Sequence, residues 1–256
     1  MKRLIISNDC DGGTVDTMCE AQDAFGSYAI PFSESCWIFA QNGVSLLDYD
    51  TEVKPSKDYM LLSQMIRNKQ IDTLHTWGDF PNGGFSRDLA IKGFKHIEHL
   101  KFPVWTAHGG YNDSQNMRPL GEGDVVESSL YHLDITQKLG VKYFNLNTDI
   151  DVHQLPTNPV RGNRLRRFRG LSKKEAYSIN INYLPEQIGM IDNIEQFGDI
   201  DLVILYTHLY ATEEPNSVER WKAVDKFKFS DRVDKCLRDL LCREGFEFTT
   251  FNEVLK

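Results

Sequence analysis

The sequence lacks any apolar stretch long enough to cross a lipid bilayer. A membrane-spanning helix needs about 18 or more consecutive apolar residues, and no such run occurs in the 256 residues. The first apolar stretch, residues 4–6, is soon interrupted by Asp9, too early for the apolar segment of a secretory signal peptide. We therefore expect a protein with no membrane span that stays in the cytoplasm.

Paired cysteines and excess positive charge are also missing. The 5 cysteines are odd in number and include no Cys-x-x-Cys pair, so neither a disulfide framework nor a zinc knuckle is indicated. A formal net charge of −8 argues against a general nucleic-acid binder, because neutralising phosphates needs a basic surface. With 41% hydrophobic residues, the chain has an ordinary globular composition that is ample for a buried core.

The most informative segment follows the first predicted strand, residues 2–8. This strand runs into the order Asp-Cys-Asp-Gly-Gly over residues 9–13. Catalytic side chains gather at the ends of parallel strands, and Asp9 and Asp11 can face one pocket, where one holds a cation and the other moves a proton. The alternative is a turn whose carboxylates bond only local backbone N–H groups. A nucleophilic Cys10 is disfavoured, because neighbouring carboxylates raise the pKa of a thiol.

Three later apolar strands also end on histidines. These histidines, with the predicted strands, are His75 (71–75), His108 (103–107) and His208 (202–207). Four strand ends that each offer Asp or His form a constellation that a purely structural account does not need. We expect them to meet at one end of a barrel.

The arrangement of elements predicts an α/β fold. From residue 71 onward strands alternate with predicted helices, at residues 86–100, 127–139, near 185–197 and 217–243. Strands separated by such helices imply right-handed crossovers and a parallel sheet. About seven strands are close to the number needed for a closed or distorted (β/α) barrel. With no repeat and no linker, residues 1–256 are predicted to form a single domain.

Two further segments carry local signals. Asn42-Gly43 between apolar runs predicts a β-hairpin inserted near residues 31–49. Residues 161–169 contain five arginines, beginning with Arg161. Such a run can bind a phosphate or carboxylate through bidentate contacts, or it can be a solvated loop or helix face paired with nearby acids.

The histidines and acids together predict a metal centre. Imidazole nitrogen and carboxylate oxygen are ordinary zinc ligands, so Asp11, His75 and Asp79 form a three-ligand set that leaves one position for water. Metal-bound water can attack a carbonyl while a neighbouring Asp takes its proton and a second His protonates the leaving group. In the alternative, His75 is a core histidine and Asp79 caps a helix.

The segment around His108 has a composition suited to a sugar. Sugar hydroxyls need polar partners and the apolar face of the ring stacks on aromatic side chains, although similar loops occur without a ligand. The candidate substrate-binding residues are Trp77, His108, Tyr111, Asn112, Asn116 and Arg161. A carbohydrate or another small polar molecule is the expected substrate.

The order of these motifs resembles the polysaccharide deacetylase superfamily, whose fold is a distorted (β/α) barrel. Residues 9–12 resemble its first acidic motif and residues 75–79 resemble its His-Ser/Thr-x-x-His motif, with Asp79 in place of the second histidine. Residues 205–208 resemble its late Leu-x-His motif, and residues 248–254 its final strand and turn. The similarity spans nearly the whole chain and marks a divergent member.

This resemblance implies an activity and a set of roles. It implies a metal-dependent hydrolase that removes an acyl group from an amide, such as the N-acetyl group of a sugar, by attack of metal-bound water. Asp9 would be the general base and His208 the general acid. Asp11, His75 and Asp79 would hold the divalent metal, for which zinc is expected.

Two other functions stay open. Residues 9–15 also resemble the haloacid-dehalogenase phosphatase signature Asp-x-Asp-Gly-Thr with one extra glycine, and Asp9 would then be the nucleophile beside magnesium. The deacetylase Arg-x-Pro motif is absent from residues 105–116, and Asp79 stands where that family has a histidine. These departures motivate a catalytically inactive barrel that binds carbohydrate.

Overall fold

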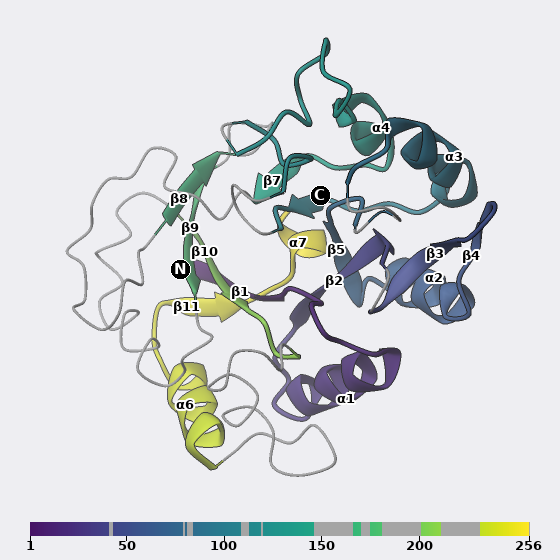
Figure 1. The fold of residues 1–256 in the computed structure, drawn as a ribbon. Coiled ribbons are helices and arrows are strands. Elements are labelled where there is room, and N and C mark those ends of the chain that lie inside the picture. The colour runs from purple at the N-terminus through teal and green to yellow at the C-terminus, as the bar shows by residue number, and fades with distance from the viewer. Residues whose placement is uncertain are drawn as a thin grey trace.

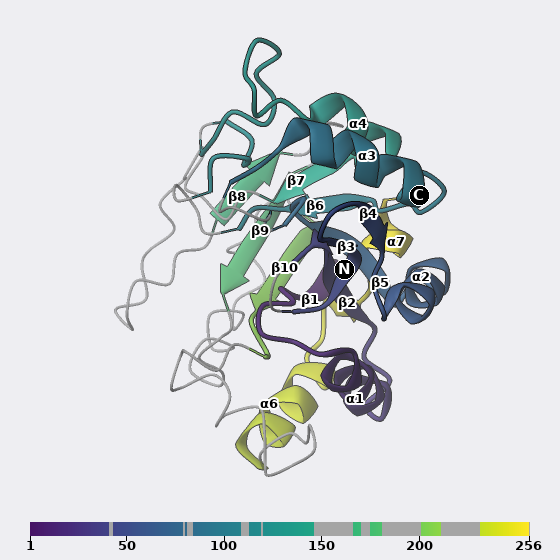
Figure 2. The same cartoon turned by 45° about the vertical axis from the view of Figure 1, so that its right-hand side comes forward.

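The computed structural model describes residues 1–40, 43–78, 80, 84–108, 113–118, 120–145, 166–169, 175–180, 201–210 and 231–255. Within these residues the fold is mixed α/β, with a curved and mostly parallel sheet and helices around its outer side (Figures 1 and 2). None of the described helices is both long and apolar enough to span a membrane.

Eleven strands and six helices are described. The strands are β1 (Lys2–Asn8), β2 (Phe32–Phe39), β3 (Ser45–Tyr49), β4 (Val53–Pro55), β5 (Ile71–His75), β6 (Val104–Thr106), β7 (Tyr143–Asn145), β8 (Arg166–Arg169), β9 (Glu175–Asn180), β10 (Leu202–Thr207) and β11 (Phe246–Phe248). The helices are α1 (Val15–Gly26), α2 (Tyr59–Arg67), α3 (Arg87–Ile97), α4 (Leu133–Lys138), α6 (Asp231–Leu241) and α7 (Phe251–Val254).

The main sheet follows the order β7-β6-β5-β2-β1-β10-β9-β8. Neighbours in this order are parallel except β8 and β9, which are antiparallel. β11 pairs with the first residues of β1 and β2 pairs with its last ones, so two strands share one edge of β1. No pairing joins β7 to β8 in the described part of the chain. The described sheet is therefore open, and the expected barrel of about seven strands is not confirmed.

The predicted β-hairpin near residues 31–49 is wrong. β2 and β3 pair in parallel, with Trp37 opposite Ser45 and Phe39 opposite Leu47, whereas a hairpin requires antiparallel strands. The antiparallel partner of β3 is β4. β2 is buried along its whole length and lies between β1 and β5, which is the environment of a central parallel strand. That burial outweighed the local turn signal.

Other elements lie close to their predicted positions. β5 and β10 have the expected bounds, and β10 is a short apolar run between polar ends. The side chain of Ser86 caps α3 by accepting from the backbone N–H of Leu89, and Thr14 caps α1 in the same way through Thr17. α4 is shorter than expected, and the predicted helix near 185–197 lies outside the described residues.

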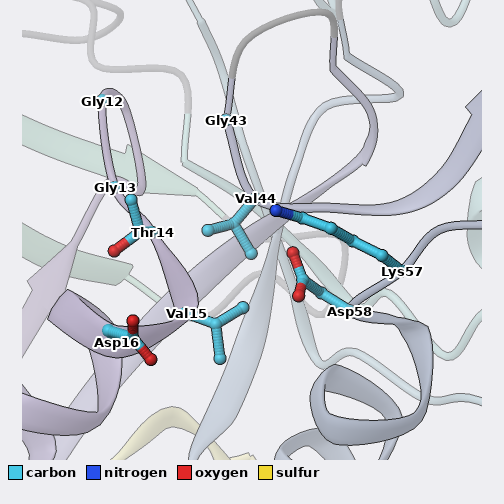
Figure 3. Close-up of a pocket in the computed structure, with 9 residues that line it drawn as sticks. All are labelled: Gly12, Gly13, Thr14, Val15, Asp16, Gly43, Val44, Lys57 and Asp58. Carbon is cyan, nitrogen blue, oxygen red and sulfur yellow. The ribbon is translucent and has the colours of Figure 1, made fainter.

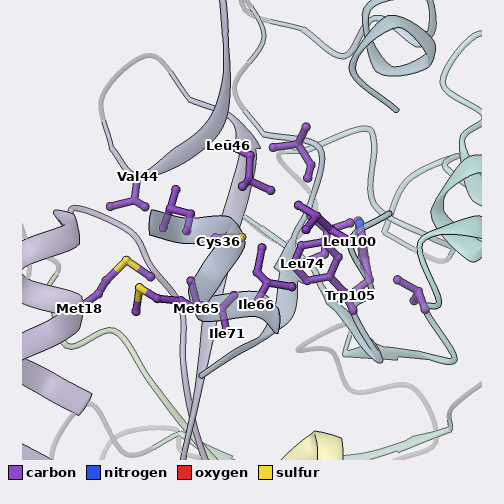
Figure 4. Close-up of a cluster of buried hydrophobic side chains, with 14 of the residues drawn as sticks. Met18, Cys36, Val44, Leu46, Met65, Ile66, Ile71, Leu74, Leu100 and Trp105 are labelled. Atoms are coloured by element: carbon purple, nitrogen blue, oxygen red, sulfur yellow. The ribbon is translucent and has the colours of Figure 1, made fainter. Parts of the chain in front are cut away.

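Side chains of the central strands alternate between two cores. In β1 and β10, Leu4 and Val203 belong to the larger core under the outer helices, whereas Ile5 and Ile204 belong to a smaller core on the inner face. Figure 4 shows part of the larger core, where side chains from α1, α2 and the neighbouring strands meet. Burial on both faces explains why these strands read as continuous apolar runs.

Helix α7 covers the inner face at the amino end of the sheet. Asp72, at the start of β5, accepts hydrogen bonds from Ser33 Oγ and from the backbone N–H of Asn252. The backbone N–H of Phe251 donates to Ser33 Oγ, so the first turn of α7 is tied to β2 and β5. The opposite, carboxyl end of the sheet is where the predicted site residues lie.

Candidate functional site

The predicted site residues end neighbouring parallel strands. Asp9 and Asp11 follow β1, and His208 follows the adjacent β10. His75 ends β5 and His108 follows β6, and these two strands are also paired. Carboxyl ends of adjacent parallel strands lie at the same edge of a sheet, so residues far apart in sequence are brought together there.

Asp11 is the centre of the cluster. Its Oδ2 atom lies 3.2 Å from His75 Nε2 and 3.6 Å from His208 Nε2. Its Oδ1 atom lies 3.8 Å from His108 Nε2. His208 Nε2 is also 3.4 Å from Asp9 Oδ2. Three imidazoles and two carboxylates therefore converge on one small volume, as the strand ends predicted.

The cluster has a buried floor and an accessible rim. The side chains of His75 and Asp9 are 1% and 2% exposed. Asp11, His208 and His108 are 25%, 28% and 33% exposed. A small molecule that arrives from solvent would therefore meet the rim first, while the floor is shielded from water.

Opposite charges perturb the His75–Asp11 pair. Burial disfavours a protonated His75, but the negative charges of Asp11 and Asp9 outweigh burial and raise the pKa of His75 to about 9. Burial would also raise the pKa of Asp11, yet His75 holds it well below its usual range. The other ring nitrogen, His75 Nδ1, is buried without a hydrogen-bond partner among the described residues. Nε2 is thus the ring nitrogen of His75 that contacts Asp11 in the cluster.

Asp9 differs from Asp11 because it is deeper. Burial raises the pKa of Asp9, and the nearby His75 and His208 only partly offset this effect. A carboxylate with a raised pKa is a better proton acceptor near neutral pH. The two acids of one turn are therefore suited to different tasks, since Asp11 favours its charged form and Asp9 binds a proton more readily.

Cys10 is not an activated nucleophile. Its side chain is fully buried, and burial, reinforced by Asp11, raises the pKa of the thiol well above its ordinary value. The expected disfavouring of the thiolate is confirmed. The backbone N–H of Cys10 donates to Ser35 Oγ and its carbonyl accepts from Gly13, so the residue shapes the turn between the two acids.

Two residues that sequence reasoning missed hold the histidines in place. The ring of Trp37, from β2, lies 4.3 Å from the ring of His75 and 4.8 Å from that of His108, measured between centroids. Asp113 Oδ2 lies 3.4 Å from His108 Nδ1. An aromatic residue in the central strand and an acid shortly after His108 were the available signals, but neither identifies its partner without the strand order.

A buried polar network joins the two strand ends that carry Asp9 and His208. Glu34 accepts from Asn8 Nδ2 at 2.8 Å and from the Tyr210 hydroxyl at 2.6 Å. Asn8 Oδ1 in turn accepts from the backbone N–H of Leu209 at 2.8 Å. Because Asn8 precedes Asp9 and Leu209 follows His208, this network fixes both residues relative to each other. A glutamate inside a predicted β-rich stretch was the signal in the sequence.

Two predicted substrate-binding residues have other roles. Trp77 is fully buried, its indole N–H donates to Thr136 Oγ1, and it belongs to the larger core. Asn116 is also fully buried and bonds both the backbone N–H and the carbonyl of His108. Both side chains are fully buried and serve the packing and the backbone of the site, so their contact with substrate stays a prediction. The remaining predicted residues Asp79, Tyr111, Asn112 and Arg161 lie outside the described residues.

The donor types of the cluster fit a divalent cation. No group of three or more His, Cys, Asp or Glu residues in the described ranges is already arranged as a metal site. The cluster is compact nevertheless: its four separations run from 3.2 to 3.8 Å. Two ligand atoms of a tetrahedral zinc ion with bonds near 2.1 Å are about 3.4 Å apart. The separations within the cluster lie on both sides of this value.

A pocket of about 600 Å³ lies beside the turn that carries Asp11. Figure 3 shows its two sides, the start of α1 on one and Lys57 with Asp58 on the other. Its described lining includes none of the clustered acids and histidines. The chemistry of the cluster and this hollow are therefore separate features.

Comparison with known proteins adds no relative: no family model matches the sequence, and searches of the curated proteins and of the solved structures found no match. The chemistry of the cluster itself therefore has to indicate the function.

Proposed function

We propose that the protein is a cytoplasmic, metal-dependent hydrolase of the polysaccharide deacetylase type. It removes an acyl group from an amide on a sugar or a similar small polar substrate. One observation carries the proposal: His75 Nε2 lies 3.2 Å from Asp11, with Asp9 and His208 in the same cluster. These four residues are the ones to which the deacetylase resemblance gives the roles of base, acid and metal ligands.

Asp11 and His75 would hold the ion, with Asp79 as the third ligand predicted from the sequence. A carboxylate that favours its charged form and an imidazole whose Nε2 faces it suit a divalent cation such as zinc. When bound, such an ion would lower the pKa of a coordinated water and polarise the acyl oxygen.

Asp9 and His208 supply the proton transfers. Asp9, buried and with a raised pKa, accepts the proton of the attacking water. His208, at the accessible rim, donates a proton to the amine that leaves when the C–N bond breaks. Asp9 and His208 lie 3.4 Å apart, so the base and the acid are within reach of the same bound substrate.

The proposal extends to the fold. A distorted barrel of the deacetylase type is supported by the parallel order of the seven strands from β7 to β9 and by β11 sharing an edge of β1 with β2. Helix α7 covers the amino end of this sheet and leaves the carboxyl end accessible, which is the end that carries the chemistry in (β/α) barrels.

Two alternatives have less support. A phosphatase that uses Asp9 as nucleophile needs no histidine, and Thr14, its signature threonine, caps α1 by bonding Thr17. An inactive carbohydrate-binding barrel would keep the rim but would not need a buried base beside an exposed imidazole. The pairing of Asp9 with His208 favours the hydrolase.

Release of acetate from N-acetylated sugars tests the proposal. The full chain is stripped of metal, reloaded with zinc or another divalent cation, and assayed with a panel of such sugars. We expect metal-dependent release that Asp9→Asn and His208→Ala each lower about 10²–10⁴-fold. Hydrolysis of an aryl phosphate that depends on Asp9 and magnesium would instead establish the phosphatase. Tight sugar binding with no turnover under any metal would establish the inactive barrel.

A further inference from the structure

We propose that His108 is a protein ligand of the metal ion, in the third position, and that Asp113 positions it for this task. The inference rests on the proposed function, because it concerns the same ion. It differs from the sequence expectation, in which Asp79 is the third ligand and His108 contacts substrate.

The geometry around Asp11 places two imidazoles on one carboxylate. His75 Nε2 faces Oδ2 at 3.2 Å, and His108 Nε2 faces the other oxygen, Oδ1, at 3.8 Å. These separations lie on either side of the roughly 3.4 Å expected between two ligand atoms of one tetrahedral zinc ion. Both rings turn Nε2 toward Asp11, so the three side chains can surround one ion.

His108 is oriented like a metal-binding histidine. Its Nδ1 atom lies 3.4 Å from Asp113 Oδ2, so this nitrogen can donate to a carboxylate while Nε2 stays free for a metal. Asp113 is itself held, because Gln115 donates to it through both its backbone N–H and its side-chain amide, each at 3.1 Å. A carboxylate behind an imidazole is the usual support for a histidine ligand.

The backbone and ring of His108 are also fixed. Asn116 accepts from the His108 N–H at 3.2 Å and donates to its carbonyl at 2.9 Å. The Trp37 ring contacts the rings of both His108 and His75, whose centroids are 5.4 Å apart at an interplanar angle of 84°. Such support limits the ring motion that binding would otherwise have to restrict.

Cobalt binding tests the assignment with a readout that does not depend on activity. The metal-free full chain is titrated with Co²⁺, and affinity and the visible absorption of the bound ion are measured. His108→Ala should weaken binding by more than the about 10–100-fold typical of losing a residue that only orients a ligand, and should change the spectrum. Asp113→Asn should weaken binding within that about 10–100-fold range. His99→Ala, a matched control at an exposed histidine, should leave both unchanged.

The two proposals fail differently. If His108→Ala and His108→Gln keep wild-type affinity and spectrum while Asp79→Asn loses them, the assignment of His108 is overturned and Asp79 is the third ligand. If Asp11→Asn and His75→Ala also leave cobalt binding unchanged, the metal-dependent function fails as well. Far-UV circular dichroism of each metal-free variant separates loss of a ligand from loss of the fold.

Discussion

The protonation state of His75 makes metal binding by the cluster depend on pH. With the pKa of His75 raised to about 9, the ring is protonated at neutral pH in the metal-free protein and pairs with the charged Asp11. Binding of a cation at Nε2 must displace this proton, so metal affinity increases with pH. The same pair stabilises the metal-free fold.

Replacing Asp11 by Asn tests this pair. An unfolded histidine titrates near 6.5, so the stabilisation from a raised pKa is fully present below that pH and is lost as pH rises through about 9. We expect Asp11→Asn to flatten the decline in the free energy of unfolding over this interval. Urea denaturation of the metal-free proteins at a series of pH values measures it. Equal slopes for wild type and variant would contradict the ion pair.

Gly78 leaves no room for a side chain. Its φ is +100°, and a Cβ atom there would lie 1.6 Å from the carbonyl oxygen of Phe39, where β2 and the end of β5 meet. Gly78→Ala should therefore destabilise the protein by about 3 kcal/mol or more. Gly26→Ala, with no atom within 4 Å of the added group, is the control and should cost little. Similar denaturation midpoints for the two variants would refute this reading of Gly78.

Among the elements, β1, β2 and the end of β10 are held together by Glu34. Burial raises the pKa of Glu34 to about 8, against the opposing hydrogen bonds from Tyr210 and Asn8. Because Glu34 binds a proton more tightly in the folded than in the unfolded protein, the free energy of unfolding falls as pH rises from about 4.5 through 8. Over this interval the folded protein must bury a charged carboxylate. The contribution of Glu34 to stability therefore depends on pH.

Two substitutions of Glu34 separate the effect of its hydrogen bonds on stability from the effect of its charge. Glu34→Gln keeps the acceptor for Asn8, and its amide can donate to the Tyr210 hydroxyl oxygen in place of the bond that Glu34 accepts, so it should remove this pH dependence with little loss of stability at pH 7. Glu34→Leu leaves both partners unsatisfied and should cost about 2–4 kcal/mol. Chemical denaturation at pH 5 and pH 8 checks both expectations. A Gln variant that keeps the wild-type decline would show that Glu34 is not its source.

The sequence predicted elements best where burial and length agree. The bounds of β5 and β10 were predicted correctly, and in β10 a run of five apolar residues leaves little choice. The Asn-Gly signal at residue 42 failed, because β2 is a central strand whose partners come from distant parts of the chain. β8, inside the arginine run, was not predicted, since its pairing with β9 depends on tertiary context that polar residues do not reveal.

The candidate site could be predicted as a set of strand ends but not as a set of contacts. Parallel strands alone bring Asp9, Asp11, His75 and His208 to one edge. Which residues support them depends on strand order, which periodicity does not give. Trp37 and Glu34 act from β2, a strand first expected in a hairpin apart from the site. Their roles therefore emerged only from the fold.

For the whole molecule, metal binding should increase the free energy of unfolding. A cation that binds only the folded state adds about 2.7 kcal/mol when its concentration is 100 times the dissociation constant. Zinc should therefore raise the melting temperature of the full chain, and chelation should reverse the rise. In Asp11→Asn and His75→Ala the rise should be lost, whereas the exposed-histidine variant His99→Ala should keep it. Zinc-induced shifts of wild-type size in all variants would place binding elsewhere.

The most direct test is anomalous diffraction from crystals of the protein grown with zinc. The proposed metal centre predicts one anomalous peak about 2.1 Å from an Asp11 oxygen and from His75 Nε2, with His108 Nε2 as a further ligand. A crystal that shows zinc bound elsewhere, or no peak between Asp11 and His75, would contradict the central claim that these distant residues surround one ion.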